Sequence, residues 1–338
     1  MRFIKKYKFV FLIFLIWRIS LLVIGYWSIG LLTFKASFPY VPEILTPSGL
    51  PQYIWHWANF DGVHYLMIAQ FGYNGIVNNE QVFFPLYPIL IRLLGNGLIS
   101  ALFISNFFAL TSGLLIYKYF GKWPLLFFYT FPTAFFLGSV YTEGLFIFLI
   151  LLTFYKNKFF GIFAGLTRLF GGFTGVMGGL GLLGYMAYLK LTFDNPLLFL
   201  FNQGGFNNGR ASSLSSLVTP FQTVYRYIKI LFTADPQNIA FWVSLLEITS
   251  FAFALGVLIY FTYKRSYNFW ILAYCWAVVI VPSLTGTLTS MPRYILVLFP
   301  IYIFLGKLNF RLKLFLAGIF VILQTVFTVL FLRGYFIA

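Results

Sequence analysis

The chain has 338 residues, of which 61% are hydrophobic and only 9% are charged, and its formal net charge is +16. Positive charge of this size would suit a nucleic-acid-binding protein. Here, however, the Lys and Arg residues lie in short clusters between apolar runs rather than on one amphipathic face, so no nucleic acid is expected as a partner. The single cysteine, Cys275, excludes a disulfide framework and a thiolate metal site.

The hydrophobic residues form runs of about 18 or more that recur from end to end, and each run is long enough to cross a bilayer as a helix. Lys and Arg at the ends of such segments favour the cytoplasm. The basic clusters therefore place the amino terminus inside; they are Arg2/Lys5/Lys6/Lys8, Lys118/Lys122, Lys156/Lys158, Lys264/Arg265 and Lys307/Arg311/Lys313. We predict an all-α polytopic membrane protein with roughly nine transmembrane segments, near 8–32, 97–117, 124–139, 140–155, 159–190, 238–263, 268–282, 294–306 and 314–332.

The whole chain, 1–338, is predicted to form one membrane domain without a separate soluble domain. Three connecting loops fall on the extracytoplasmic side, at about 35–81, 191–237 and 283–293. Most acidic residues lie in these loops, and arginine predominates among the basic residues outside the inner clusters. Because arginine binds phosphate in a bidentate manner, we expect an anion site on the outer face.

The first outer loop contains the stretch "WHWANFDGVHYLMIAQFGY" (55–73), in which one aspartate and both histidines gather. The apolar spacing after Asp61 predicts a short helix closed by a glycine, with Asn59 and Asp61 as possible N-caps. His64 lies one turn further on, so its side chain can share a face with Asp61. Asp61 is then either a helix cap or a reactive carboxylate, and His64 either packs or assists it. His56, between two tryptophans, is most simply part of an aromatic belt.

Residues 82–95 are predicted to form a half-span or interfacial helix that contains Arg92. Arg92 and Arg168 are candidate phosphate ligands, or else they extend from apolar segments toward the headgroups. Glu143, in "VYTEGLF", is an ionisable residue at membrane depth and therefore a functional candidate. An ion pair between Glu143 and Arg168 is the alternative.

Segment 159–190 contains nine glycines and predicts one interrupted crossing. Its "GGFTGVMGGLG" (171–181) has no preceding strand, so close helix packing is expected rather than nucleotide binding. Arg210 stands in "NQGGFNNGRASS", a mobile loop that either closes over an acceptor or only connects segments. In the third outer loop, Arg293 follows Pro292 in "SMPRY" and either anchors a helix end or binds phosphate.

Five motifs carry a resemblance to one family through their order and spacing. They are "FDGVHYLMIAQFGY", "FFPLYPILIRLL" (83–94), "FPTAFFLGSVYTEGLFI" (131–147), "AGLTR" (164–168) and "GTLTSMPRYILVLFP" (286–300). Over nearly its whole length the chain resembles the PIG-V-like glycosyltransferases, relatives of GPI mannosyltransferase II within the GT-C superfamily of integral-membrane enzymes.

The resemblance implies a GT-C-like bundle with extracytoplasmic loop helices and an enzyme that takes a sugar from polyprenyl phosphate. It makes Asp61 the catalytic residue and favours Arg293 as a ligand of the donor phosphate, with Arg168 and Arg92 as further cations. Supporting or substrate-binding roles then fall to His64, Tyr65, Glu143, Tyr294 and Arg210. The chain departs from the family in having Asn59 and Phe60 where Arg-Trp is expected. No second acidic residue adjoins Asp61, so no cofactor is assigned and a divalent metal has no clear ligand cluster.

We therefore expect an inverting glycosyltransferase that moves a hexose, mannose by the resemblance, from polyprenyl phosphate to a hydroxyl of a lipid-linked glycan or similar glycolipid. A lipid donor fits because nucleotide sugars are cytoplasmic, whereas the candidate site faces outward. The membrane would be the plasma membrane of a prokaryote or the endoplasmic reticulum of a eukaryote. The alternatives are a transporter or flippase, whose paired charges and inverted repeats are not evident, and an inactive assembly subunit.

Overall fold

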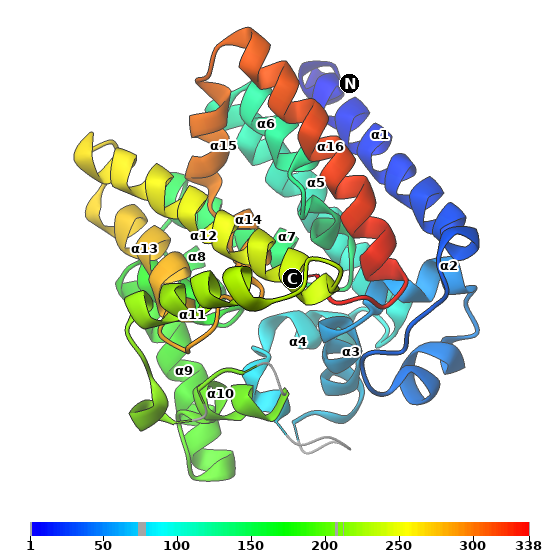
Figure 1. Cartoon of the computed structure of the whole chain (residues 1–338), viewed down its shortest axis with the longest axis vertical. Helices are drawn as coiled ribbons and strands as arrows, with labels where there is room; N and C mark the ends of the chain where they lie inside the picture. Colours follow the sequence, from blue (N-terminus) through cyan, green and yellow to red (C-terminus); the bar gives the residue numbers. More distant parts are fainter. Residues whose placement is uncertain (1, 74–78, 207–208, 212, 338) are drawn as a thin grey trace. The chain divides into compact units, whose positions relative to one another are not determined.

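The computed structural model describes residues 2–73, 79–206, 209–211 and 213–337. In these ranges all regular secondary structure is helical and no strand occurs, which confirms the predicted all-α class (Figure 1). The α-helices are α1 (Arg2–Leu31), α2 (Gln52–Trp55), α3 (Asp61–Phe71), α4 (Leu86–Leu93), α5 (Leu98–Phe120), α6 (Lys122–Thr130), α7 (Glu143–Tyr155), α8 (Phe160–Gly165), α9 (Val176–Phe193), α10 (Leu198–Phe201), α11 (Pro220–Thr233), α12 (Ile239–Tyr263), α13 (Phe269–Ser283), α14 (Met291–Leu296), α15 (Phe299–Gly306) and α16 (Phe310–Leu332). Short 3₁₀ or π turns between them include η4 (Glu80–Val82) and η6 (Leu169–Thr174).

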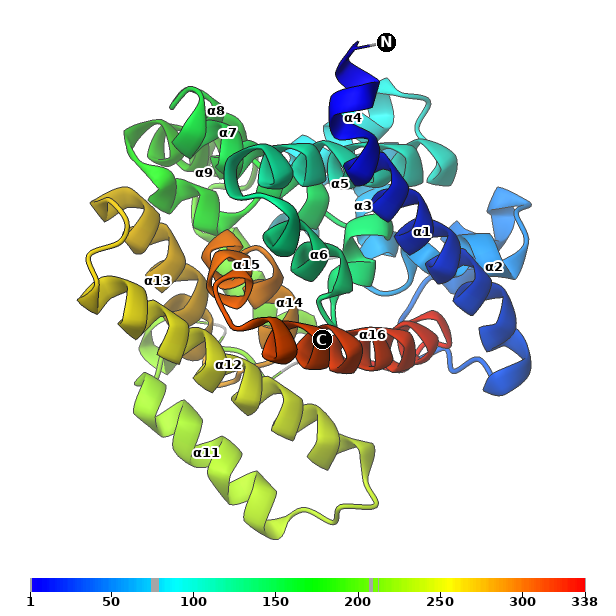
Figure 2. The same cartoon turned by 90° about the horizontal axis from the view of Figure 1, so that it is seen from above.

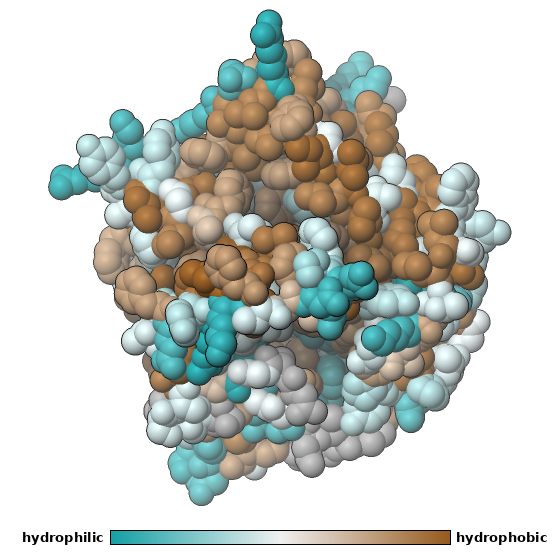
Figure 3. Space-filling model, viewed as in Figure 1, coloured by the Kyte–Doolittle hydropathy of each residue, from teal (hydrophilic) through white to brown (hydrophobic). Residues whose placement is uncertain are grey.

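Five helices are long and apolar enough to cross a membrane. They are Lys5–Leu31 within α1, Leu98–Phe120, Val176–Phe193, Ile239–Tyr263 and Phe310–Leu332. Hydrophobic surface gathers over α16 in Figure 3. Phe315, Ile322 and Val326 are among the exposed side chains of this helix. A continuous exposed apolar surface of this kind suits contact with lipid, as expected for a helical membrane protein.

Besides segment 159–190, which was predicted to be interrupted, two of the nine predicted segments are divided in the structure. Segment 124–139 is divided between α6 and the 3₁₀ turn Ala134–Gly138. Helix α6 ends at Thr130 because Pro132 follows and cannot donate the next helical hydrogen bond. Segment 294–306 is divided between α14 and α15, because Pro300 lacks the N–H that would carry one helix through. Segments 140–155 and 268–282 correspond to α7 and α13, which are apolar but shorter than the five long helices.

The described residues form two compact units. The first comprises 2–73, 86–151 and 299–337, and the second comprises 79–85 and 152–298. In the first unit α1 packs against α5, α6 and α16, and α15 packs against α6; Figures 1 and 2 show α1 and α16 side by side. Trp57, Tyr87 and Tyr129 are among the largest side chains buried in this unit, so its core is mainly aromatic.

In the second unit α8, η6 and α9 pack closely, as the glycine-rich sequence predicted. A Cβ atom at Gly165 would lie 2.2 Å from the carbonyl oxygen of Gly178, and one at Gly181 would lie 2.0 Å from that of Ile162. Side chains are therefore excluded at these positions, and the predicted interruption of segment 159–190 is confirmed. Further along the chain α11 and α12 lie side by side (Figure 2), and α13 and α14 pack against α12.

Candidate active site

Asp61 is the half-buried first residue of α3, and the backbone just before it is firmly held. Asn59 Nδ2 donates to the carbonyl oxygens of Phe331 at 2.9 Å and Leu332 at 3.2 Å. The carbonyl oxygen of Asn59 in turn accepts from the Tyr141 hydroxyl at 3.1 Å. These bonds tie the start of α3 to the end of α16 and to the turn before α7, which suits a preorganised functional group.

The predicted capping role of Asn59 and Asp61 is wrong. Phe60 occupies the N-cap, its side chain makes no capping hydrogen bond, and Asp61 already lies inside the helix. The side chain of Asn59 does not cap because its amide is turned toward α16. Phe60 also has a φ of +59°, a conformation that is strained for a bulky residue. Strain of this kind persists only where the surrounding structure imposes it, and it clusters at functional sites.

His64 lies one turn after Asp61, as predicted, and is only 5% exposed. Burial lowers the pKa of His64 to about 4, although the charge of Asp61 acts in the opposite direction. The imidazole is therefore neutral at neutral pH. The Tyr40 ring stands edge-on to it, with ring centres 6.3 Å apart. A neutral imidazole can orient a carboxylate through a hydrogen bond, but it supplies no positive charge for a phosphate.

Tyr65 and Glu143 both act on a buried tyrosine of α4. The Tyr65 ring stands edge-on to Tyr87, with ring centres 5.1 Å apart, and the Tyr87 hydroxyl shares a 2.6 Å hydrogen bond with Ser105 Oγ. Burial raises the pKa of Tyr87 above its ordinary value, and the charge of Glu143 contributes in the same direction. Glu143, at the start of α7, is fully buried. A polar cluster thus joins α3, α4, α5 and α7 within the first unit.

The predicted aromatic belt at residues 55–57 is wrong, because Trp55, His56 and Trp57 are all buried in the first unit. They pack against α1, where Gly25 leaves room for Trp57 and His56. The guanidinium of Arg18, also on α1, lies 4.5 Å from the centre of the Trp57 ring. Arg18 is a candidate that sequence reasoning missed, although an arginine near the middle of the first apolar run was a visible signal. Its Nη1 is buried and has no hydrogen-bond partner within the described chain.

Three of the predicted cations converge on one tyrosine in the second unit. The guanidinium carbons of Arg210 and Arg293 lie 5.5 and 5.8 Å from the centre of the Tyr294 ring. The charges of Arg210, Arg293 and Arg168 all act on Tyr294. Arg168 and Arg293 are only 9% and 8% exposed. Three positive charges therefore act on one buried hydroxyl, an arrangement that suits an anion.

The loop before Arg293 is held by side chains of α11 and α12. Glu247 of α12 accepts from the Ser290 backbone N–H at 3.1 Å and from the Tyr227 hydroxyl at 2.5 Å. The Tyr227 oxygen accepts from the Leu288 backbone N–H at 3.0 Å. Buried Glu247 thus fixes the turn that precedes Arg293, a positioning role that the sequence did not assign to it.

Arg210 is anchored in the described structure. Its Nη1 donates to Gln203 Oε1 at 3.0 Å, and its Nη2 donates to the carbonyl oxygen of Thr289 at 2.8 Å. Arg210 therefore ties its own loop to the loop that leads to Arg293. Residues 207, 208 and 212 of the predicted mobile loop lie outside the described residues, and the mobility of that loop stays a prediction.

The predicted site residues divide between the two units. The first contains Asp61, His64, Tyr65, Arg92 and Glu143, and the second contains Arg168, Arg210, Arg293 and Tyr294. Arg92 is exposed in the last turn of α4, beside the exposed Leu93 and Leu94. This position favours the alternative in which Arg92 extends from an apolar surface toward the headgroups over a role as a phosphate ligand. Glu143 and Arg168 belong to different units, and their ion pair stays a prediction.

Glu80, in η4 of the second unit, is a further residue that the sequence did not single out. It is fully buried, and neither carboxyl oxygen has a hydrogen-bond partner among the residues described. Burial raises the pKa of Glu80 to about 8, so the carboxyl is mostly protonated at neutral pH. The adjacent Gln81 is well bonded, since its Oε1 accepts from Asn202 Nδ2 at 2.8 Å and its carbonyl oxygen accepts from the Tyr185 hydroxyl at 2.7 Å. The only signal in the sequence was the scarcity of acidic residues.

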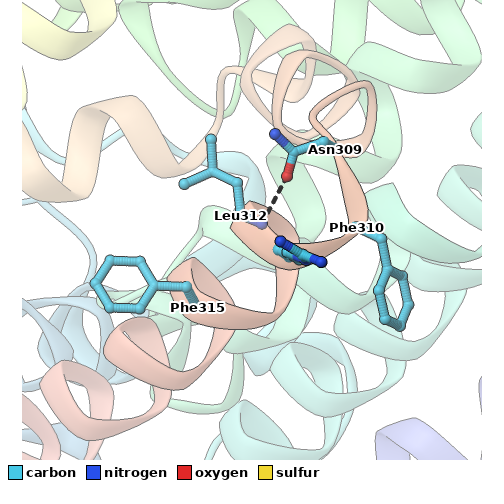
Figure 4. Close-up of a pocket in the computed structure, with 5 residues that line it drawn as sticks. Asn309, Phe310, Leu312 and Phe315 are labelled. Carbon is cyan, nitrogen blue, oxygen red and sulfur yellow. Dashed lines mark hydrogen bonds between the residues drawn. The ribbon is translucent and has the colours of Figure 1, made fainter.

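A surface pocket at the start of α16 lies apart from these residues in the sequence. It is lined by Asn309, Phe310, Arg311, Leu312 and Phe315 (Figure 4). Asn309 Oδ1 accepts from the Leu312 backbone N–H at 2.9 Å and so caps the helix. The pocket contains no predicted site residue and no carboxylate. Across the described ranges, moreover, no group of three His, Cys, Asp or Glu side chains is placed to hold a metal.

Comparison with known proteins gives no family model, no curated protein and no solved structure that matches the chain. The resemblance to PIG-V-like enzymes therefore rests on the sequence motifs. The arginine cluster around Tyr294 and the firmly held start of α3 are the structural observations that bear on function.

Proposed function

We propose that the protein is an inverting glycosyltransferase that transfers a hexose, with mannose as the expected sugar, from polyprenyl phosphate to a hydroxyl of a lipid-linked glycan or similar glycolipid. The observation that carries the proposal is the convergence of Arg168, Arg210 and Arg293 on Tyr294. A phosphate offers several acceptor oxygens and a negative charge, which a group of guanidinium forks matches in both geometry and sign.

The proposed reaction assigns two tasks to the candidate residues. In the second unit the arginines bind the donor phosphate and stabilise the negative charge that it gains as it leaves. In the first unit Asp61 acts as the general base. The acceptor oxygen bonds to the anomeric carbon from the face opposite the phosphate, the bond from that carbon to the phosphate oxygen breaks, and the acceptor proton passes to Asp61. Polyprenyl phosphate leaves with the electron pair.

The proposal includes a GT-C-like arrangement of about nine crossings, in which shorter and broken helices add to the five long ones. The added crossings would be α6, α7, α13 and the α14–α15 pair. The candidate residues then face the extracytoplasmic side, where a lipid-linked sugar is the available donor. A membrane-embedded site of this kind belongs to the plasma membrane of a prokaryote or the endoplasmic reticulum of a eukaryote.

Single cysteines test this topology at exposed positions. Cysteines that replace Ser215 and Gln237 should react with an impermeant thiol reagent added outside intact cells, because both lie in the second outer loop. A cysteine that replaces Asn157, which lies in an inner cluster, should react only after the membrane is opened. Cys275 is buried and gives a low background. Labelling in the opposite sense would contradict the outward-facing site.

A transfer assay tests the reaction itself. We expect the purified protein in liposomes to release polyprenyl phosphate from a polyprenyl-phosphate hexose and to add the hexose to one of a series of glycolipid acceptors. A flippase would instead move a labelled lipid-linked glycan between the leaflets without forming a glycosidic bond. If the protein moved the labelled glycan across the bilayer but transferred no sugar with any donor or acceptor, it would be a flippase and the proposal would be wrong.

A further inference from the structure

Helix α11 (Pro220–Thr233) presents three different faces along its length. An α-helix turns by about 100° per residue, so positions spaced four, three and four residues apart form one row. One row of α11 faces the protein, a second is apolar and exposed, and a third is polar and exposed.

The row that faces the protein fixes the rotation of the helix. Thr223 and Tyr227 are both buried. Thr223 Oγ1 donates to the carbonyl oxygen of Ser283 at 2.7 Å, and the Tyr227 hydroxyl donates to Glu247 of α12 at 2.5 Å. Because these contacts hold one side of α11 against the second unit, they also determine which side chains point away from it.

The apolar row points away from the protein and consists of large side chains. Phe221 is 87% exposed, Tyr225 66%, Ile228 43% and Phe232 86%. A helix that only connected two membrane segments in water would gain nothing from aromatic and aliphatic residues at these positions. Their exposure leaves apolar area in contact with water unless another apolar phase covers it.

The polar row is displaced by one residue, or about 100°, from the apolar row. It contains Gln222, Arg226, Lys229 and Thr233, all exposed. Arg226 also holds the helix to the second unit, because its Nη1 donates to the carbonyl oxygen of Gly286 at 3.2 Å. No acidic residue occurs in the helix, so the charge of this row is purely positive. Both exposed rows run from the first turn to the last.

We propose that α11 is a membrane-surface helix, with its apolar row inserted among lipid acyl chains and its positive row facing anionic headgroups. Helices that lie in the bilayer interface typically have an apolar side and a basic side that both run along the helix. A crossing orientation is disfavoured because it would carry the exposed Lys229 into the hydrocarbon. Lipid contact of α11 does not depend on the proposed transfer reaction.

A second copy of the chain suits this surface less well than lipid does. A stable protein interface buries about 800 Å² on each partner, whereas the apolar row is one side chain wide. The adjoining α12 is itself apolar and long enough to cross a membrane, so the neighbouring element already requires lipid. The positive row, without a carboxylate on the same helix, matches anionic headgroups better than it matches an identical positive row.

Spin labels on adjacent residues give a matched test in the full-length chain. In a Cys275→Ala background, Ile228→Cys and Lys229→Cys are labelled separately, and each protein is reconstituted in vesicles of neutral and anionic phospholipid. Collisions with oxygen, which is enriched in hydrocarbon, are compared with collisions with a water-soluble nickel chelate. We expect the ratio of oxygen to nickel accessibility to be several-fold higher at position 228 than at 229. A second pair, Phe232→Cys and Thr233→Cys, should repeat the difference.

Two results would overturn the lipid assignment. Equal ratios with high nickel accessibility at both members of each pair would place the apolar row in water. Dipolar broadening between labels at position 228, removed by dilution with unlabelled protein, would assign the row to a second copy of the chain. Misfolding is controlled by melting temperatures, which should equal that of the unlabelled parent. All four labelled positions are exposed, so the labels should not disturb the core.

Discussion

Asp61→Asn should reduce the rate of sugar transfer by about a hundredfold to ten-thousandfold, the usual cost of losing a general base. Asparagine keeps the size and polarity of the side chain but cannot take the proton of the acceptor hydroxyl. It also cannot stabilise the positive charge that grows on the sugar ring as the phosphate departs. The rate of transfer with purified Asp61→Asn and parent protein, at saturating donor and acceptor, measures the effect.

The stability of Asp61→Asn should change little, which separates chemistry from folding. Asp61 is not the N-cap of α3, and its charge in the first turn of the helix contributes about 0.3–1 kcal/mol. Glu43→Gln is the matched control, because Glu43 is an exposed carboxylate in the same loop and unit. If Asp61→Asn and Glu43→Gln both transferred sugar like the parent, Asp61 would be a structural residue and the mechanism would be wrong.

Arg293→Lys is expected to lower transfer by about tenfold to a hundredfold, because a hydrogen bond to a charged group contributes about 1.5–3 kcal/mol. Lysine keeps the positive charge but loses the planar fork that can grip two phosphate oxygens. Arg293→Ala should be at least as severe. If the contact between Arg293 and phosphate forms mainly in the transition state, its loss lowers kcat. If the contact is equally strong with the bound donor, its loss raises KM instead.

Arg265→Lys is the matched control for Arg293→Lys, since Arg265 is an exposed arginine of the same unit in an inner basic cluster. It should transfer sugar at the parental rate. Parental turnover by Arg293→Lys and Arg293→Ala, in proteins that melt like the parent, would reduce Arg293 to a membrane anchor. The cluster around Tyr294 would then need another explanation.

The long helices could be predicted from the sequence because an apolar run of sufficient length is itself the physical cause of a membrane helix. Segments 238–263 and 97–117 differ from α12 and α5 by only a few residues at their ends. The divided segments could not be predicted from hydropathy, because Pro132 and Pro300 interrupt backbone hydrogen bonding without interrupting the apolar composition.

The candidate residues that lie close together in the sequence could be predicted. Asp61 and His64 lie one turn apart in a helix, as their spacing indicated, and burial explains why the imidazole is neutral. The convergence of Arg168 and Arg210 on Tyr294 depends on contacts between residues far apart in the chain, which spacing cannot reveal. Glu80 was missed for a similar reason, because a loop position gave no sign that tertiary packing buries it.

Arg18 has a consequence for the way the protein enters the membrane. Its guanidinium lies over Trp57 in the folded chain, but α1 is synthesised before residue 57 and can enter the bilayer before that contact forms. An arginine at the centre of an inserting helix costs about 2.5–3.5 kcal/mol, which the surrounding leucine, isoleucine and phenylalanine residues must offset at about 0.3–0.6 kcal/mol each. The high hydropathy of Lys5–Leu31 is therefore needed for insertion itself. Arg18 acquires its aromatic cover later, when the turn that precedes Asp61 docks onto α1.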